Sequence, residues 1–137
     1  FEFGKELARK YGYKVLSVNT FWEDVLNKTD HYYWNCKPEE FIYLISHAEC
    51  VVTNSFHGLS FSMIFNRPVI LFEKDDKGNS RMNDLIDVLG AHEVKDRMVK
   101  EQVIIPQINF NDINRNIKNY RERSIRYLNL LMQGNNK

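Results

Sequence analysis

Cys50-Val51-Val52-Thr53-Asn54-Ser55-Phe56-His57-Gly58-Leu59 is the stretch of sequence that decides the fold. Its first four residues form a short, mostly apolar run, which predicts a buried strand over 50–53. Residues 56–65 are typical of a helix, and Asn54 and Ser55, between the two elements, are both favourable helix N-caps. A strand that leads through a short turn into a helix is the repeating unit of α/β folds with a parallel sheet.

The same alternation extends upstream of this unit. Residues 3–11 predict a helix and residues 14–18 a short strand. The aromatic stretch 19–36 is longer than an ordinary loop and matches neither pattern, so it is left unassigned. Pro38 then suits the first position of a helix that ends near His47, because its missing N–H has no partner to lose there.

Downstream of the unit the alternation continues to the end of the sequence. We expect a strand over 69–72, a helix that Ser80 caps and that runs through Leu89, a last short strand over 103–105, and a long amphipathic helix from the N-cap Asp112 to Gly134. Together these elements predict a single α/β domain over residues 1–137 with a mostly parallel sheet.

The composition is ordinary for a soluble globular protein, with 43% apolar and 27% charged residues. The formal net charge of +1 provides no overall electrostatic attraction to nucleic acid or to an anionic membrane. No apolar run approaches the roughly 18–20 residues that a membrane-spanning helix needs. Cys36 and Cys50 are too few for a disulfide scaffold, so reduced thiols in a cytoplasmic protein are the default expectation.

Three groups of residues, in this order, resemble the polysaccharide pyruvyl transferase family. The first is Pro38-Glu39-Glu40-Phe41, leading through Ile45-Ser46-His47-Ala48 to Val51-Val52-Thr53; the second is Thr53-Asn54-Ser55-Phe56-His57-Gly58-Leu59-Ser60-Phe61-Ser62 with Arg67-Pro68-Val69-Ile70; the third is Asn79-Ser80-Arg81 with Asp84-Leu85-Ile86-Asp87-Val88-Leu89-Gly90. The resemblance spans roughly residues 14–131. Its specific part is the Ser-Phe-His-Gly element between a strand and a helix.

This resemblance implies an enzyme that transfers a pyruvyl group from phosphoenolpyruvate to a sugar of a cell-surface polysaccharide, forming a cyclic ketal. It also implies a Rossmann-like three-layer α/β/α domain, the C-terminal half of a GT-B-like two-domain protein, closed by a long C-terminal helix. The sequence begins at Phe1 without Met or a signal peptide, so we expect an N-terminal domain in a longer parent chain. The expected location is the cytoplasm, and attachment to the inner face of the membrane and a lipid-linked saccharide acceptor are left open.

His57 is the expected catalytic residue, because the family contacts the donor through a His at this place. An imidazole is suited to bind a phosphate or to transfer a proton. Asn54, Ser55, Phe56 and Gly58 are the expected donor-binding residues around it, since the N-terminus of a helix attracts anions and glycine permits close approach to the backbone. A purely structural role for His57, as a cap or in the core, remains the alternative.

One position departs from the family pattern. Many members carry Arg two residues before this His, where the present chain has Ser55. We expect Arg81 to supply the missing positive charge, together with Asn79 and Ser80 beside it. The alternative is that Arg81 is an ordinary surface residue.

Two other functions remain open from the sequence. A GT-B transferase with a nucleotide-sugar donor would need an acid for the ribose, and Glu73 or Asp75 would be in place for it. A non-catalytic α/β binding domain is the second. We expect no metal site, because the histidines lack ligand spacing, and no cofactor beyond the donor substrate, because no dinucleotide or phosphate-loop motif is present. The aromatic residues 32–34 could stack on an acceptor sugar or on their own domain.

Overall fold

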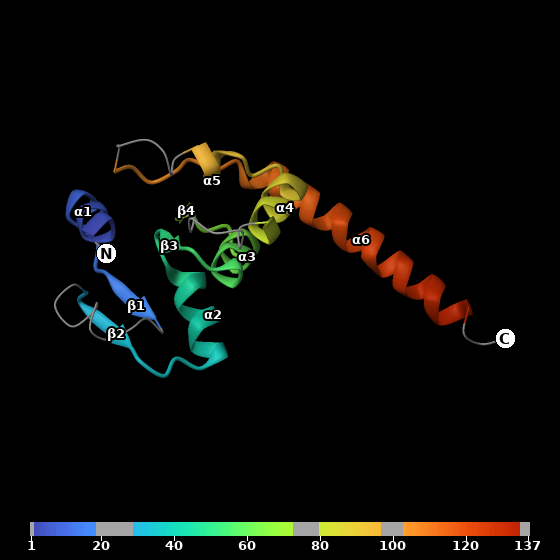
Figure 1. The fold of residues 1–137 in the computed structure, drawn as a ribbon, viewed down its shortest axis with the longest axis horizontal. Helices are drawn as coiled ribbons and strands as arrows, with labels where there is room; N and C mark the ends of the chain where they lie inside the picture. The colour runs from blue at the N-terminus through green and yellow to red at the C-terminus, as the bar shows by residue number, and fades with distance from the viewer. Residues whose placement is uncertain (1, 19–28, 73–79, 97–102, 135–137) are drawn as a thin grey trace.

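The computed structural model describes residues 2–18, 29–72, 80–96 and 103–134, and structural statements refer to these ranges (Figure 1). The elements in chain order are α1 (Glu2–Tyr11), β1 (Leu16–Val18), β2 (His31–Tyr33), α2 (Pro38–His47), β3 (Val51–Thr53), α3 (Phe56–Ile64), β4 (Val69–Leu71), α4 (Ser80–Leu89), α5 (Glu93–Asp96) and α6 (Phe110–Gly134). The predicted α/β class is therefore confirmed.

The strands form two separate parallel pairs. β1 pairs with β2, and β3 pairs with β4, so that Val51 lies opposite Val69 and Thr53 opposite Leu71. The prediction of parallel pairing is confirmed. β2 lies in the stretch that the sequence left unassigned, and β3, α3 and β4 together form the β-α-β unit that the sequence predicted.

The core lies around α3, β4 and the helices that follow. Its buried members are Leu59 and Met63 of α3, Val69 and Leu71 of β4, Met82, Ile86 and Leu89 of α4, Ala91, Val94 of α5, and Ile113 of α6. All of β4 is buried, whereas Val52 in the middle of β3 is 40% exposed. The prediction of a buried strand over 50–53 is therefore wrong for Val52, whose side chain points to the opposite face from its neighbours in the strand.

Helix α1 packs against segments that are distant in the sequence. The rings of Phe3 and Phe72 meet edge to face with centroids 5.3 Å apart. Lys10 donates a hydrogen bond to the Val103 carbonyl, and the Ile105 N–H donates to the Tyr11 hydroxyl. These backbone groups thus bond to side chains of α1, and residues 103–105 are not in a strand, so the predicted strand there is wrong.

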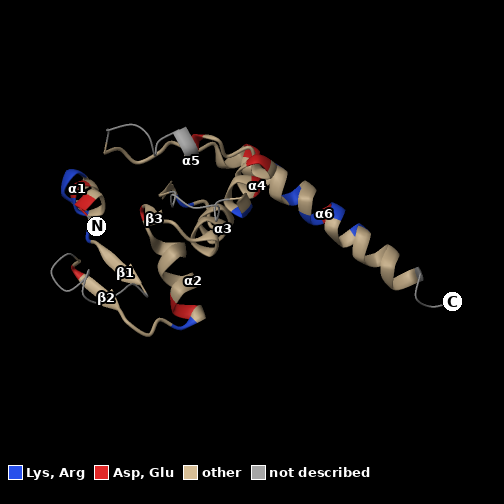
Figure 2. Cartoon of the chain, viewed as in Figure 1, with Lys and Arg blue, Asp and Glu red and all other residues tan. Residues whose placement is uncertain are grey.

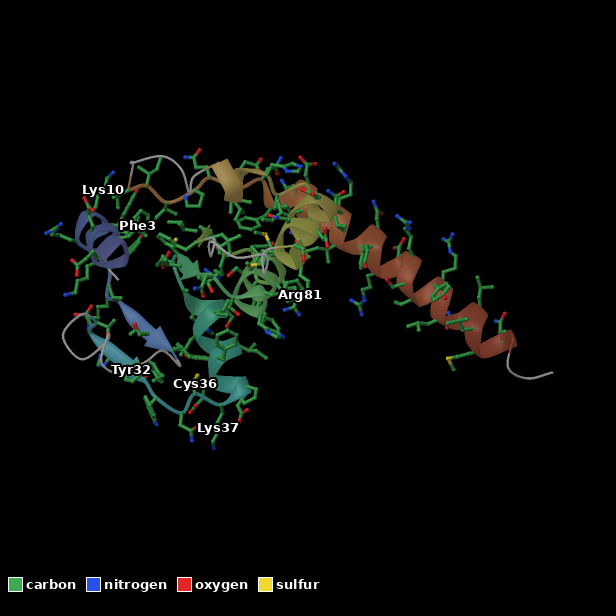
Figure 3. All side chains as sticks on the ribbon, in the orientation of Figure 1. Phe3, Lys10, Tyr32, Cys36, Lys37 and Arg81 are labelled. Carbon is green, nitrogen blue, oxygen red and sulfur yellow. The ribbon has the colours of Figure 1, made fainter. Side chains whose placement is uncertain are left out.

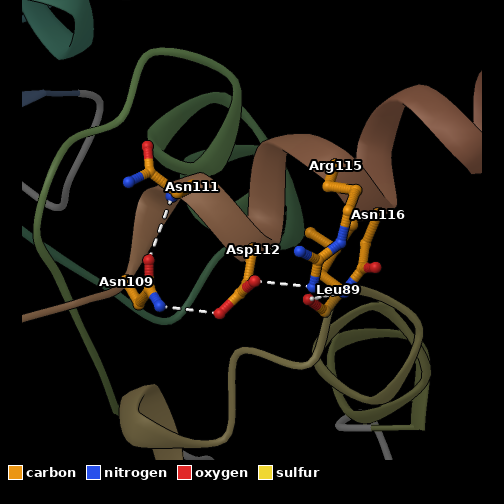
Figure 4. A network of polar contacts seen from close by, with 6 residues as sticks. All are labelled: Leu89, Asn109, Asn111, Asp112, Arg115 and Asn116. Atoms are coloured by element: carbon orange, nitrogen blue, oxygen red, sulfur yellow. Dashed lines mark hydrogen bonds and ion pairs between the residues drawn. The ribbon is translucent and has the colours of Figure 1, made fainter.

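A local network fixes the start of α6 (Figure 4). The Asn109 side chain accepts a hydrogen bond from the Asn111 N–H and donates one to Asp112, which also pairs with Arg115. Asn109 therefore caps the helix, which begins at Phe110, and the prediction of Asp112 as the N-cap is wrong. Asp112 instead lies in the first turn, where its negative charge suits the helix dipole.

The two halves of α6 differ in their surroundings. Asn116 donates a hydrogen bond to the Leu89 carbonyl at the end of α4, and Ile113 is buried in the core. From Lys118 to Gln133 every residue is exposed, and the helix extends away from the rest of the domain (Figure 1). The amphipathic helix is confirmed, but its packing on the domain ends at Ile117.

Candidate functional site

The turn between β3 and α3 is held by its own backbone and by Thr53. Ser55 occupies the N-cap position with an extended backbone, and its carbonyl accepts a hydrogen bond from the Leu59 N–H. Its own N–H donates to the Thr53 hydroxyl at 3.0 Å, while its side chain makes no capping hydrogen bond. Ser55 is therefore the cap by position, as predicted, with an exposed hydroxyl that the helix does not use.

Gly58 is required by close packing between the helix and the strand. A Cβ atom at this position would lie 2.5 Å from the Thr53 hydroxyl oxygen, closer than real Cβ contacts allow. The glycine thus brings the first turn of α3 directly onto the end of β3. This contact explains the residue without a ligand, and the close approach of a ligand to the Gly58 backbone stays a prediction.

The predicted site residues around this turn reach solvent. Asn54, Ser55 and His57 are exposed, whereas Phe56 is half-buried and packs against the core. The rings of Phe56 and His57 meet edge to face at 5.9 Å. The exposure of His57 excludes a core role, and the first turn of α3 beside it carries N–H groups that have no partner within the helix.

Arg81 lies over the same aromatic ring. Its guanidinium carbon is 5.8 Å from the centre of the Phe56 ring, a cation–π distance, and Arg81 itself is exposed in the first turn of α4 (Figure 3). Helices α3 and α4 contact each other. Phe56 therefore contacts both an exposed imidazole and an exposed guanidinium, which come from the first turns of two adjacent helices.

The remaining predicted residues are placed as follows. Ser80 is exposed as the first residue of α4, while Asn79, Glu73 and Asp75 lie outside the described residues. Tyr32 packs edge to face against Trp34, which stays 64% exposed.

Neither cysteine is an activated nucleophile. Burial raises the pKa of Cys50 to about 12. Desolvation, followed by the nearby charges of Glu40 and Glu39, also raises the pKa of Cys36. Neither thiol forms a disulfide, and with a raised pKa both remain protonated at neutral pH.

Within residues 2–18, 29–72, 80–96 and 103–134, no group of three or more His, Cys, Asp or Glu side chains is arranged to hold a metal ion. None of the described helices combines the length and the apolar character that crossing a membrane requires.

Comparison with known proteins adds the decisive observation. A family model described as polysaccharide pyruvyl transferase matches residues 6–76, which include the four strands of the described part of the chain and the complete turn at 54–58. The chain belongs to the polysaccharide pyruvyl transferase family. No curated protein and no solved structure matches it significantly. The resemblance seen in the sequence is thereby confirmed, while Ser80 and Arg81 lie beyond the matched residues of this pyruvyl transferase family member.

The roles of two residues that shape the site were not predicted from the sequence. Thr53 both accepts the Ser55 N–H and fills the space beside Gly58. The feature of the sequence that indicates this role is a Thr at the end of a strand, two residues before the N-cap. Phe56 was predicted as a donor-binding residue, but its position below Arg81 depends on α4, which the local sequence does not reveal.

Proposed function

We propose that this chain is the donor-binding half of an enzyme that transfers a pyruvyl group from phosphoenolpyruvate to a saccharide. The observation that carries the proposal is the arrangement at the two helix starts, where the exposed side chains of His57 and Arg81 both contact the Phe56 ring. Family membership supports the class of reaction.

The charges at the corner formed by residues 54–58 and Arg81 suit the donor. Phosphoenolpyruvate carries a phosphate and a carboxylate, and the first turn of α3 offers N–H groups and the positive end of the helix dipole. Arg81 adds a full positive charge where Ser55 replaces the arginine of other members. Among the described residues Arg81 pairs with no carboxylate, so its charge is not already neutralised there. Asn54, Ser55 and Ser80 supply exposed polar groups around it, and Asn79 completes the proposed set.

Ketal formation requires proton transfer as well as binding. The methylene carbon of the donor gains a proton and becomes a methyl group. Two sugar hydroxyls each lose a proton and form a C–O bond to the central carbon, and the C–O bond to the phosphate breaks; the second proton leaves with the phosphate. His57 is the proposed acid–base group, because it is the exposed titratable side chain on the first turn of α3.

The wider architecture follows from the same proposal. The chain would be a Rossmann-like three-layer domain, a proposal that the parallel pairing of β1 with β2 and of β3 with β4 supports. The corner would form one wall of a GT-B-like cleft whose other wall is an N-terminal domain. The acceptor would be a saccharide, in lipid-linked form or free, on the cytoplasmic side. No metal or cofactor is required besides the donor substrate.

The test compares two exposed histidines in the full-length protein. His57→Ala should lower phosphate release from phosphoenolpyruvate in the presence of acceptor by roughly 10²–10⁴-fold, the usual contribution of an acid–base group. His92→Ala is the matched control, since His92 is exposed near Asp87 and follows the end of α4, whereas Arg81 lies at its start, and the activity of this variant should equal wild type. His57→Gln should retain donor binding without turnover.

Two results would contradict the proposal. The first is full activity of His57→Ala with a lowered melting temperature, which would make His57 structural. The second is release of nucleotide from a nucleotide-sugar, with no phosphate from phosphoenolpyruvate, which would assign the corner to a different donor.

A further inference from the structure

The outer half of α6, residues 118–133, carries an apolar stripe that continues a buried one. Ile113 and Ile117 face the domain, and Ile113 is 2% exposed. Steps of three and four residues place Tyr120, Ser124, Tyr127, Leu128 and Leu131 on the same side of the helix. The four large apolar side chains in this continuation are 49–63% exposed. The stripe therefore continues along the same side of the helix beyond Ile117, but there it no longer packs against the domain.

Basic side chains flank this stripe. Residues 118–133 contain Lys118, Arg121, Arg123 and Arg126 against the single acid Glu122, a net charge of +3 (Figure 2). At 3.6 residues per turn, Arg121 and Arg123 lie on opposite borders of the stripe, whereas Lys118 and Arg126 lie on the far side. Long basic side chains at such borders extend their charge toward phosphate groups while their stems cover apolar surface.

We propose that the outer half of α6 binds the surface of an anionic lipid bilayer, with the stripe of Tyr120, Tyr127, Leu128 and Leu131 immersed at the headgroup level. An amphipathic helix with basic borders and an apolar face containing Tyr and Leu is suited to this interface. A second copy of the chain fits less well, because two segments of net charge +3 would repel each other along the contact. The net charge of the whole chain, +1, conceals this local concentration of charge.

The proposal is independent of the catalytic assignment. It needs neither His57 nor the donor, and it predicts only where the protein resides. A surface helix of this kind would bring the enzyme close to acceptors that are themselves held at a membrane.

The test is co-sedimentation of the full-length protein with vesicles. We expect binding to vesicles of phosphatidylcholine mixed with phosphatidylglycerol, little binding to phosphatidylcholine alone, and release at high salt. Leu131→Ser should reduce the partition coefficient by about tenfold, because a leucine no longer enters the apolar layer. The matched control is Leu130→Ser, since Leu130 is similarly exposed but turned roughly 100° around the helix from Leu131.

The basic borders are tested in the same way. The Arg121→Glu/Arg123→Glu double variant should lose more than about tenfold in partition coefficient, whereas Arg126→Glu should lose clearly less. Circular dichroism of every variant should match wild type, since all these side chains are exposed.

Three results would overturn the proposal. They are absence of vesicle binding by the wild-type protein, equal losses in Leu130→Ser and Leu131→Ser, and a solution dimer that Leu131→Ser dissociates without any effect on vesicle binding. A tryptophan placed by Leu131→Trp provides a second readout: its emission should shift to the blue on adding anionic vesicles. Emission that is already blue-shifted without vesicles would show that another part of the protein covers the stripe.

Discussion

The corner at residues 54–58 and the outer half of α6 both reach solvent, but they do so in different ways. At the corner, the exposed polar groups belong to a closely packed turn, because Phe56 contacts the core and Gly58 lies directly against Thr53. Along the outer half of α6, the exposed groups are apolar, and the helix that carries them does not pack on the domain. The first arrangement holds side chains in place before a ligand arrives. The second has the composition of a surface that another apolar layer covers.

The largest expected effect separates the two halves of α6. Ile113→Ala removes a buried side chain and should lower the free energy of unfolding by about 2–5 kcal/mol. Leu131→Ala, near the other end of the same helix, should change it by less than about 0.5 kcal/mol, since the side chain is already exposed. Chemical denaturation of the two variants measures both values. Equal losses would mean that the outer half is packed in solution.

A smaller effect tests whether the corner is rigidly packed. Gly58→Ala should lower the free energy of unfolding by about 1–3 kcal/mol, because the new methyl group would overlap Thr53. Gly4→Ala is the matched control, since a Cβ atom at Gly4 meets nothing within 4 Å, and this substitution in α1 should stabilise the protein slightly. If Gly58→Ala melted like wild type, the contact between α3 and β3 would be looser than described.

The thiols have the smallest effect on stability at neutral pH, and their effect depends clearly on pH. With its pKa raised from 9.0 to about 12, Cys50 should react with iodoacetamide roughly a thousandfold more slowly than an ordinary thiol at pH 8. Above pH 9.0 the unfolded chain loses this proton while the folded chain keeps it, so stability should fall as pH rises from 9.0 toward 12. Mass spectrometry of the labelled native protein should find Cys36 modified first. Prior labelling of Cys50 would contradict its burial.

The parts of the fold that the sequence predicted are those fixed by local chemistry. The strand, the Ser55 cap and α3 follow from residues that lie next to one another, and the same stretch carries the resemblance that the family match confirms. The interval β3-α3-β4 was likewise predicted, because its apolar runs are short and clearly bounded.

The predictions from the sequence were wrong where contacts between residues far apart in the chain determine the structure. Val103 and Ile105 have the composition of a strand, but their backbone groups bond to Lys10 and Tyr11 at the other end of the chain. Strand β2, His-Tyr-Tyr, has no apolar alternation and exists through its pairing with β1.

Two further features could not be predicted from neighbouring residues in the sequence alone. Asn109 and Asp112 are both good N-caps, and the preference for one of them does not depend on residue type alone. The periodicity of α6 predicted a stripe, but a stripe does not say what covers it.

The central claim, that the corner with His57 and Arg81 binds the donor, is tested most directly by calorimetric titration of the full-length protein with phosphoenolpyruvate. Arg81→Gln should weaken the affinity by about tenfold or more, because the lost group is a charged hydrogen-bond donor to an anion. Arg115→Gln, which removes an exposed arginine paired with Asp112 on α6, should bind like wild type. If Arg81→Gln bound phosphoenolpyruvate with wild-type affinity, the assignment of this corner to the donor would be contradicted.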